Sequence, residues 1–501
     1  MLYMNRLAFH LFLALSVLVG YAGQVTAQYS GSHEVPDVLR TGFDSITPEQ
    51  SREWLSLLAG PSFEGRGTGQ VGYTKAAHWV AGKCAEWGLE PMGDGNTYFQ
   101  LLPMKQLTLD PSQSKVLGPN GLAFDVEGNL GLERFADQGL VTGNVVVMRF
   151  AGDVQQLDES LSLRDKVVIY VADEAAQRRV PFLIARQGPA VALRVVDDTP
   201  QSSSQLIQPG GRSRSTSISG TISRTAANTL VEALGGNQDW LTSPSERFAI
   251  HETNGDVTLQ LMFREQSAGV PNVVAWLEGT DPELRHEYLV IGAHLDHLGN
   301  RGGSIYPGAD DNGSGSTAVL NIARALSLNP VKPKRSVLFI WFAAEEIGLV
   351  GSRYFVNNPT LPLENMICML NIDMVGRNEE KPGESADENI DTIHLIGSRR
   401  GDPTLHDVII EANQYINFVF EYDEEGVFGR SDQASFFAQG TSVAFLFGGF
   451  HPDYHQPGDL PEKINYDKVA AAAKLFYLTI YFATERGKFT PPGKPADEVG
   501  Q

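Results

Sequence analysis

Cysteine is nearly absent from this chain, which has Cys84 and Cys368 among its 501 residues. Two thiols cannot form a thiolate metal site between them. Cys84 shares a predicted helical face with apolar side chains, and Cys368 lies inside an apolar run. We therefore expect two buried free thiols rather than a disulfide.

Basic residues are also few, with 39 Lys and Arg against 60 Asp and Glu and a formal net charge of -21. This balance argues against nucleic acid or an anionic membrane as a partner, since both require a positive surface. The acidity itself indicates solubility rather than a cationic substrate. The length allows two or three domains at roughly 100–200 residues each.

Long apolar runs are missing except for residues 7–20. Arg6 precedes that run, and Val25-Thr26-Ala27 is a small-residue cleavage site. We interpret residues 1–27 as a signal peptide, with an uncleaved anchor as the alternative. The bulk of the protein is then exported, periplasmic or secreted, with no stable membrane span after cleavage. The sequence leaves the oligomeric state open.

The remaining chain divides by composition. Residues 28–47 are polar and predict a loose lead-in, whereas apolar strands alternate with helices in the C-terminal half. That alternation predicts an α/β fold with a mixed, mostly parallel sheet covered by helices on both faces. The expected domains are an N-terminal part of this fold at 28–107, an inserted β-rich domain at 108–256, the rest of the fold at 257–490 and a flexible tail at 491–501.

Ligating side chains follow three of the apolar runs. His294, Asp296 and His297 end the first, Glu345-Glu346 the second and Asp373 the third. Ligands bind beyond the carboxyl ends of strands in open α/β sheets. We therefore expect these side chains to meet at one edge of the sheet.

Two loops contribute further candidates, Asp311 after a Gly-rich loop and His455 after the last predicted strand. Imidazoles and carboxylates without thiolate suit zinc or a similar divalent ion. The candidates exceed what one tetrahedral zinc with an open position needs, so two ions sharing a carboxylate are expected. Asp310 remains an alternative to Asp311, and His297 and His451 are expected to be structural or to support the ligands rather than to bind metal.

Five segments together resemble the co-catalytic zinc exopeptidases of the bacterial leucyl aminopeptidase and aminopeptidase Y type. They are GAHLDHLG, PGADDNGSG, FAAEEIGLVGS, NIDMVGR and HPDYHQPGD, in the family's order. One departure is Gln433, which stands where the family usually carries His. The inserted region resembles a protease-associated domain by position and β-rich character.

The resemblance implies a role for each candidate. His294 and Asp373 would bind one zinc ion, Glu346 and His455 the other, and Asp311 both. Glu345 would be the general base acting on a metal-bridging water. Asp296 would orient His294 through its second ring nitrogen.

The implied function is an exported di-zinc aminopeptidase that removes N-terminal residues from peptides. A carboxypeptidase or dipeptidase on the same site is the first alternative. A glutaminyl cyclase and an inactive receptor-like scaffold are less favoured, because the full ligand set is present. Phe428, Phe447 and Phe450 are candidates for lining the specificity pocket or for the core.

Overall fold

The computed structural model describes residues 29–489, apart from 136–138, 159–160, 178, 208–216, 243–247, 302 and 424. The predicted signal peptide and the predicted tail at 491–501 lie outside the described residues. Within the described part, the model contains no helix with the length and apolar character of a membrane span. The chain forms two compact units, one running up to Leu102 and on from Val270, the other Pro103–Gly269.

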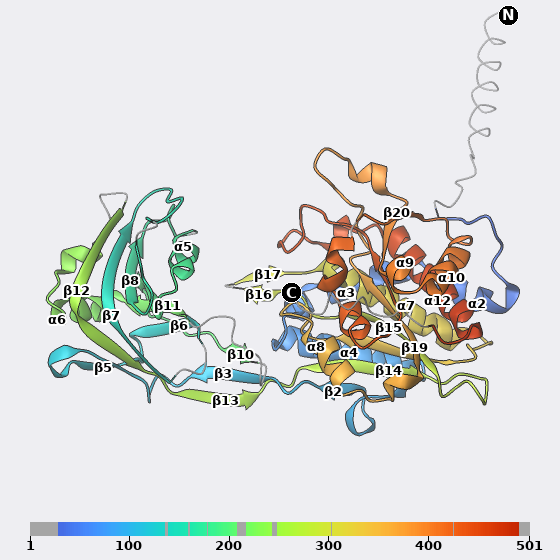
Figure 1. The fold of residues 1–501 in the computed structure, drawn as a ribbon, viewed down its shortest axis with the longest axis horizontal. Helices are drawn as coiled ribbons and strands as arrows, with labels where there is room; N and C mark the ends of the chain where they lie inside the picture. Colours follow the sequence, from blue (N-terminus) through green and yellow to red (C-terminus); the bar gives the residue numbers. More distant parts are fainter. Residues whose placement is uncertain are drawn as a thin grey trace, which may run out of the picture. The chain divides into compact units, whose positions relative to one another are not determined.

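The first unit is built on a nine-stranded sheet of order β1-β14-β18-β15-β19-β22-β20-β21, with β2 also paired to β14 (Figure 1). The four central strands β18, β15, β19 and β22 are parallel, whereas β14 runs antiparallel to β18 and β20 runs antiparallel to β22. The predicted mixed sheet is confirmed, and its largest parallel part is the group of central strands. The strands are β1 Glu90–Pro91, β2 Phe99–Leu101, β14 Pro271–Leu277, β15 Tyr288–His294, β18 Ser336–Phe342, β19 Met366–Asp373, β20 Thr392–Ile396, β21 Val419–Glu421 and β22 Val443–Phe447.

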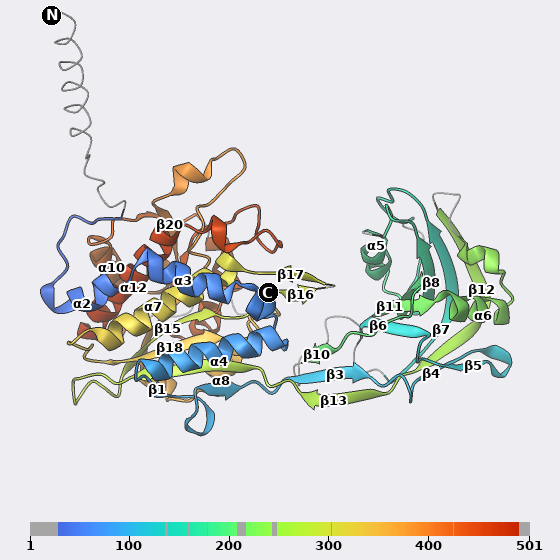
Figure 2. The same cartoon turned by 180° about the vertical axis from the view of Figure 1, so that it is seen from behind.

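Both faces of this sheet are covered, as the alternation of side chains along β18 shows. The Trp341 indole donates a hydrogen bond to the Ser316 carbonyl of α7, and the next residue, Phe342, packs its ring 5.8 Å from Phe436 of α11. Successive strand side chains point to opposite faces, so α7 and α11 lie on different sides. The helices, seen from both directions in Figures 1 and 2, are α2 Asp37–Ser45, α3 Pro48–Leu58, α4 Val71–Glu86, α7 Gly315–Leu328, α8 Val350–Asn357, α9 Ser398–Gly401, α10 Pro403–Asn413, α11 Gln433–Phe437 and α12 Tyr466–Glu485.

The expectation of a loose lead-in at 28–47 is wrong for its second half, where α2 forms. Leu39 and Gly42 of α2 are buried, and the Gly42 amide donates to the Asn329 side chain at 3.1 Å. Tertiary packing on α7 thus supports a helix that local composition does not predict. Both cysteines are buried free thiols, as expected.

The second unit is rich in strands. It contains an eight-stranded sheet of order β5-β4-β12-β7-β8-β9-β11-β6 and a three-stranded sheet of order β10-β3-β13. It is wider than the expected 108–256 because β3 and β13 pair with each other and so belong together. The resemblance to a protease-associated domain stays a prediction. The elements are β3 Lys105–Leu109, β4 Lys115–Leu117, β5 Ala123–Asp125, β6 Leu130–Arg134, β7 Leu140–Phe150, β8 Val167–Ala172, α5 Val180–Arg186, β9 Val191–Val196, β10 Gln205–Ile207, β11 Ile218–Ser223, α6 Arg224–Ala233, β12 Phe248–Gln260 and β13 Phe263–Ser267.

Candidate metal centre

The carboxyl edge of the central sheet gathers the predicted side chains. His294 is the last residue of β15 and pairs in register with Phe342, the last residue of β18. Asp373 ends β19 beside Phe447, which ends β22. Strands that are parallel and in register place their C-terminal residues at one edge, which is why positions far apart in the chain converge there.

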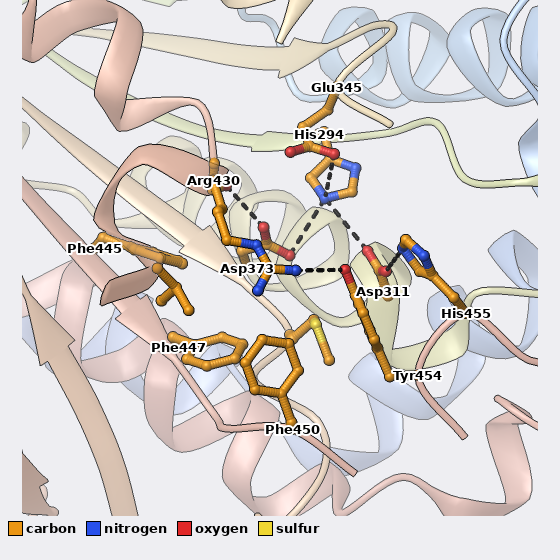
Figure 3. A pocket seen from close by; sticks show the side chains of 13 residues that line it. His294, Asp311, Glu345, Asp373, Arg430, Phe445, Phe447, Phe450, Tyr454 and His455 are labelled. Carbon is orange, nitrogen blue, oxygen red and sulfur yellow. Dashed lines mark hydrogen bonds and ion pairs between the residues drawn. The ribbon is translucent and has the colours of Figure 1, made fainter. Parts of the chain in front are cut away.

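A first group of donors surrounds His294. Its Nε2 atom lies 3.3 Å from Oδ1 of Asp373 and 3.4 Å from Oδ1 of Asp311 (Figure 3). The potential ligand atoms of these three residues all lie within 4.8 Å of one another, and all three residues are buried. This is a spacing at which one cation can contact all three.

A second group lies on the other oxygen of the same carboxylate. The Nε2 atom of His455 is 3.1 Å from Oδ2 of Asp311 and 3.1 Å from Oε2 of Glu346. Asp311 therefore faces both groups, as a carboxylate shared by two cations would. Asp310, the alternative, contacts His451 and the Gly376 amide instead.

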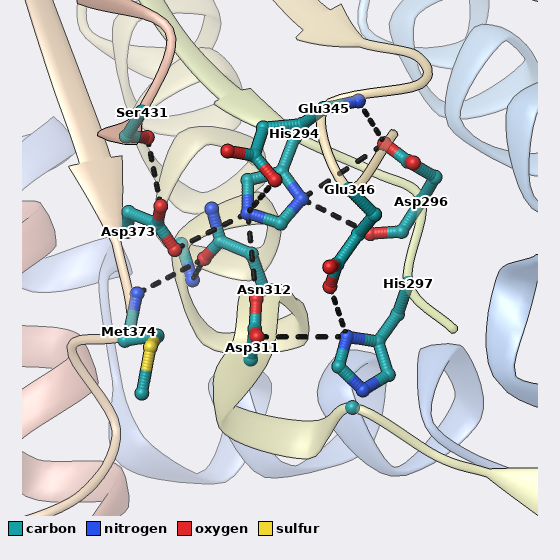
Figure 4. A network of polar contacts seen from close by, with 12 residues as sticks. His294, Asp296, His297, Asp311, Asn312, Glu345, Glu346, Asp373, Met374 and Ser431 are labelled. Carbon is teal, nitrogen blue, oxygen red and sulfur yellow. Dashed lines mark hydrogen bonds and ion pairs between the residues drawn. The ribbon is translucent and has the colours of Figure 1, made fainter. Parts of the chain in front are cut away.

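His297 also lies close to this second group, although the sequence favours a structural or supporting role for it over a ligand. Its Nδ1 atom lies 2.7 Å from Oε1 of Glu346 and 3.7 Å from Oδ2 of Asp311 (Figure 4). His297, Asp311 and Glu346 have ligand atoms within 4.8 Å of one another. A cation held by Asp311 and Glu346 thus has two imidazoles within reach, His297 and His455.

The donor chemistry fits divalent cations. Among the described residues, both ring nitrogens of His297 and Oε1 of Glu346 are buried without a hydrogen bond of good geometry, although His297 and Glu346 are in close contact. Buried polar atoms normally have a partner, and a bound ion is one explanation when they do not. All donors are nitrogen or oxygen, a set suited to zinc and similar ions.

The pKa values of His455 and Glu346 show that this cluster of carboxylates stabilises a positive charge among them. Burial opposes charge on His455, yet its contacts with Asp311 and Glu346 raise its pKa to about 9. Burial also disfavours the Glu346 carboxylate, but hydrogen bonds from His297 and His455 lower its pKa below the usual range. Protons and metal ions compete for such sites, so a cation in either form stabilises the cluster.

Glu345 differs from its neighbour. It lines the same pocket, 3.9 Å from Nε2 of His294, but belongs to neither donor group. Burial, together with the negative charges of Asp432 and Asp373, raises the pKa of Glu345 well above its usual value. A carboxyl group with a raised pKa is a stronger base than an ordinary glutamate, so it is suited to accept a proton and to return it.

Asp296 contacts its neighbours differently from the expectation. Nδ1 of His294 is 3.0 Å from the Asp296 main-chain oxygen but 3.9 Å from its carboxylate. The carboxylate instead accepts hydrogen bonds from the Thr68 hydroxyl at 2.6 Å and the Glu345 amide at 3.1 Å. Asp296 therefore fixes His294 through its backbone and the main chain of Glu345 through its side chain.

The Gly-rich turn at 64–69 supplies residues that sequence reasoning missed. Arg66 is fully buried and donates to the carbonyls of Leu58, Leu295, Pro307 and Gly308 at 2.7–2.9 Å. It thereby joins the end of β15 to the loop before Asp311. In the sequence, a basic residue between glycines indicates a turn but does not indicate which carbonyl groups the arginine contacts.

Ser431 and Gln433 hold the opposite side of the site. The Ser431 hydroxyl donates to Oδ2 of Asp373 at 2.7 Å, and Asn371 donates to both Ser431 and Gln433 at 2.8 Å. Gln433, the departure from the family pattern, also donates to the Phe428 carbonyl. Gln433 thus contacts Asn371 and Phe428, not the residues of the two donor groups.

One pocket opens onto the donor groups. Phe447 and Phe450 line it, whereas Phe428 is buried in the core with its ring 5.1 Å from Phe437. One wall is therefore aromatic and the opposite side carries the ligating groups (Figure 3). The lining is His294, Asp311, Glu345, Asp373, Met374, Val427, Arg430, Ser431, Phe445, Phe447, Phe450, Tyr454 and His455.

A third group with metal-ligand spacing, Glu379, His394 and Glu421, lies beside β22. Lys381 already contacts it, with its Nζ atom 3.1 Å from Glu379 and 2.7 Å from Asp423. The ammonium group supplies the positive charge there, so we interpret this group as an ion-pair network.

The fold and the donor groups define a candidate site for two cations at the edge of an α/β sheet. Residues 272–480 match the model of Peptidase family M28, and this segment belongs to that family.

Individual relatives point the same way. The leupeptin-inactivating enzyme 1 of Streptomyces exfoliatus is 34% identical over 196 residues, which cover 39% of this chain and 40% of that protein. Aminopeptidase YwaD of Bacillus subtilis is 30% identical over 215 residues, covering 41% and 43%. The chain thus spans less than half the length of these curated relatives.

Solved structures share the fold over most of the chain. The aminopeptidase from Aneurinibacillus sp. strain AM-1 superposes with a TM-score of 0.51 at 19% identity, covering 91% of this chain and 97% of that one. A zinc aminopeptidase from Bacillus subtilis gives 0.50 at 18% identity, covering 90% and 96%. At these identities the likeness establishes the fold.

Proposed function

We propose that this protein is an exported aminopeptidase that uses two zinc ions to remove N-terminal residues from peptides. The observation that carries the proposal is the position of Asp311, whose two oxygens lie 3.4 Å from His294 and 3.1 Å from His455. The M28 match of residues 272–480 supports peptide hydrolysis. The names of the relatives, among them leucine aminopeptidase 2 of Trichophyton rubrum, favour the amino end of the substrate.

His294 and Asp373 would hold one zinc ion, Glu346 and His455 the other, and Asp311 both. His455 is preferred to His297 because it lies on the pocket wall. When bound, the ions would polarise the scissile carbonyl and lower the pKa of a water molecule. The set of nitrogen and oxygen donors without thiolate supports zinc.

Proton transfer falls to Glu345. Its carboxylate faces the pocket beside His294, and its raised pKa lets it take the proton of the attacking water and pass it to the leaving amine. The Asp296 carboxylate accepts a hydrogen bond from the main-chain amide of Glu345, which fixes the position of the Glu345 backbone. Tyr454 lines the same pocket and receives a hydrogen bond from Arg430 at 3.2 Å, so its own hydroxyl hydrogen is free to point toward a substrate oxygen.

The aromatic side of the pocket favours an apolar side chain at the cleaved residue. Phe445, Phe447 and Phe450 offer apolar surface within the same cavity as the donor groups. Burial of such a side chain contributes on the order of 1.5–3 kcal/mol of binding.

The decisive experiment measures metal content and substrate range on the purified protein. We expect two zinc ions per chain and hydrolysis of peptides with a free amino terminus, but not of the same peptides when N-acetylated. Cleavage from the carboxyl end of the acetylated peptides would establish a carboxypeptidase instead. N-terminal sequencing of the exported protein tests whether cleavage follows Ala27.

A further inference from the structure

The segment from His451 to Asp459 contacts the Asp310-Asp311 pair through three of its residues. It follows β22 and carries His455, which faces Asp311 and Glu346. Two of its other residues, His451 and Asp459, contact the Asp310-Asp311 pair directly. Neither belongs to a donor group.

Asp459 binds the main chain at the shared carboxylate. Its two oxygens accept the Asp310 amide at 3.0 Å each, and one accepts the Asp311 amide at 3.1 Å. Its own carbonyl accepts the Ala309 amide at 3.2 Å. Three successive amides, those of residues 309–311, are thus held by one residue that has no exposed surface.

His451 fixes the neighbouring side chain. Its Nε2 atom lies 3.2 Å from Oδ2 of Asp310, while Oδ1 of Asp310 accepts the Gly376 amide at 2.6 Å. Both side chains of this contact are fully buried. With the Asp310 carboxylate held in this direction, the adjacent Asp311 carboxylate extends toward His294 and His455.

A buried carboxylate is a costly way to satisfy two amides unless its charge and geometry matter. An ionised carboxylate only accepts hydrogen bonds, so both of its oxygens can face amide donors at once. An Asn side chain has one accepting oxygen and would turn an NH2 group toward the same amides. The contacts of Asp459 therefore require an aspartate and cannot all be made by an asparagine.

We propose that Asp459, assisted by His451, is a positioning residue that sets the location of the Asp311 carboxylate between the two zinc ions. The inference rests on the proposed function, because it takes Asp311 as the shared ligand. It also explains why one segment carries both a zinc ligand and its support. The same loop that brings His455 to Asp311 holds Asp311 in place for His455.

The test compares Asp459→Asn with Asp453→Asn in the full chain. Asp453 lies on the same segment but pairs with Lys463 and Arg377. Zinc affinity is measured by competition with a chelator, without substrate. We expect Asp459→Asn to lose about 10–100-fold in zinc affinity, the range found for outer-shell partners of metal ligands. Asp453→Asn should stay within threefold of the wild type.

A change in ligand position should also alter the visible absorption of the cobalt-loaded variant, which general destabilisation of a folded protein does not do. Wild-type affinity and an unchanged cobalt spectrum in Asp459→Asn overturn the proposal. If that variant does not fold, His451→Leu is tested in its place. A loss of about tenfold in zinc affinity supports the positioning role. An unchanged affinity overturns it. A wild-type chain that binds zinc but cleaves no peptide refutes the proposed function alone.

Discussion

The Nε2 atom of His455 lies 3.1 Å from Oδ2 of Asp311, and Oδ1 of the same carboxylate lies 3.4 Å from Nε2 of His294. Two loops and a strand end contribute these three residues. One carboxylate thus lies between two imidazoles that approach it from different parts of the chain.

Glu345→Gln should separate proton transfer from metal binding. The amide cannot accept the proton of the attacking water, so kcat should fall by on the order of a hundredfold to ten-thousandfold. Zinc content should remain at two per chain, because Glu345 belongs to neither donor group. Steady-state kinetics and metal analysis on the same sample check both parts. Normal turnover in this variant would remove Glu345 from the mechanism.

His455→Ala and His297→Ala form a matched pair that identifies the second imidazole ligand. Both residues lie close to Glu346, at 3.1 Å and 2.7 Å. We expect His455→Ala to retain one zinc ion per chain and His297→Ala to retain two at reduced affinity. Metal content after dialysis against a weak chelator distinguishes them. The reverse pattern would make His297 the ligand.

The sequence predicts the convergence of the site well because strand ends carry it. His294 and Asp373 end parallel strands, and the register of those strands brings them together whatever the details of the loops.

The supporting contacts could not be predicted in the same way. Thr68 reaches Asp296, and Arg66 reaches Gly308, across more than two hundred residues of chain. Such contacts depend on how loops pack and leave no periodic pattern in the sequence. His297 shows the same limit, since a histidine three residues beyond the end of β15 can face either side.

Removal of the metal should destabilise the folded chain as well as inactivate it. Without cations, His294, Asp311, Glu346 and Asp373 leave several buried charges to be neutralised by protons alone. A ligand present at a thousand times its Kd adds about 4 kcal/mol to the free energy of unfolding.

We therefore expect a chelator to abolish hydrolysis and lower Tm, and added zinc to restore both. Asp311→Asn is the control, because a chain that has lost the shared carboxylate should gain little Tm from zinc. Equal gains in the variant and the wild type would mean that zinc binds elsewhere.

Substitution of Arg430 tests whether this residue makes the protein favour short peptides. Its guanidinium lies at the pocket, over the Phe450 ring and 3.2 Å from the Tyr454 hydroxyl. Such a group can bind the terminal carboxylate of a dipeptide. Arg430→Gln should then raise KM for dipeptides by about tenfold, the equivalent of 1.4 kcal/mol, and leave KM for dipeptide amides unchanged. An equal rise in KM for both substrates would mean that Arg430 acts by holding the Tyr454 hydroxyl instead of binding the substrate carboxylate.

Lys468 of α12, which is not one of the metal ligands, makes the free energy of unfolding depend on pH. It is fully buried and donates to the carbonyls of Arg377 and Asn389 at 3.1 and 3.3 Å. Burial lowers the pKa of Lys468 to about 8, although nearby carboxylates such as Asp310 and Glu379 oppose the shift. In the unfolded chain a lysine pKa is about 10.4.

Between pH 8 and about 10 the unfolded state therefore binds more protons at Lys468 than the folded state, so this residue makes stability rise with pH by at most about 1.4 kcal/mol per unit. Lys468→Met removes that contribution. We expect the free energy of unfolding of the wild type minus that of Lys468→Met to increase from pH 8 to pH 10, as measured by urea denaturation. Lys463→Met, which loses only a surface ion pair with Asp453, should show no such increase. A pH-independent difference for Lys468→Met would mean that the ammonium keeps its proton in the folded core up to alkaline pH.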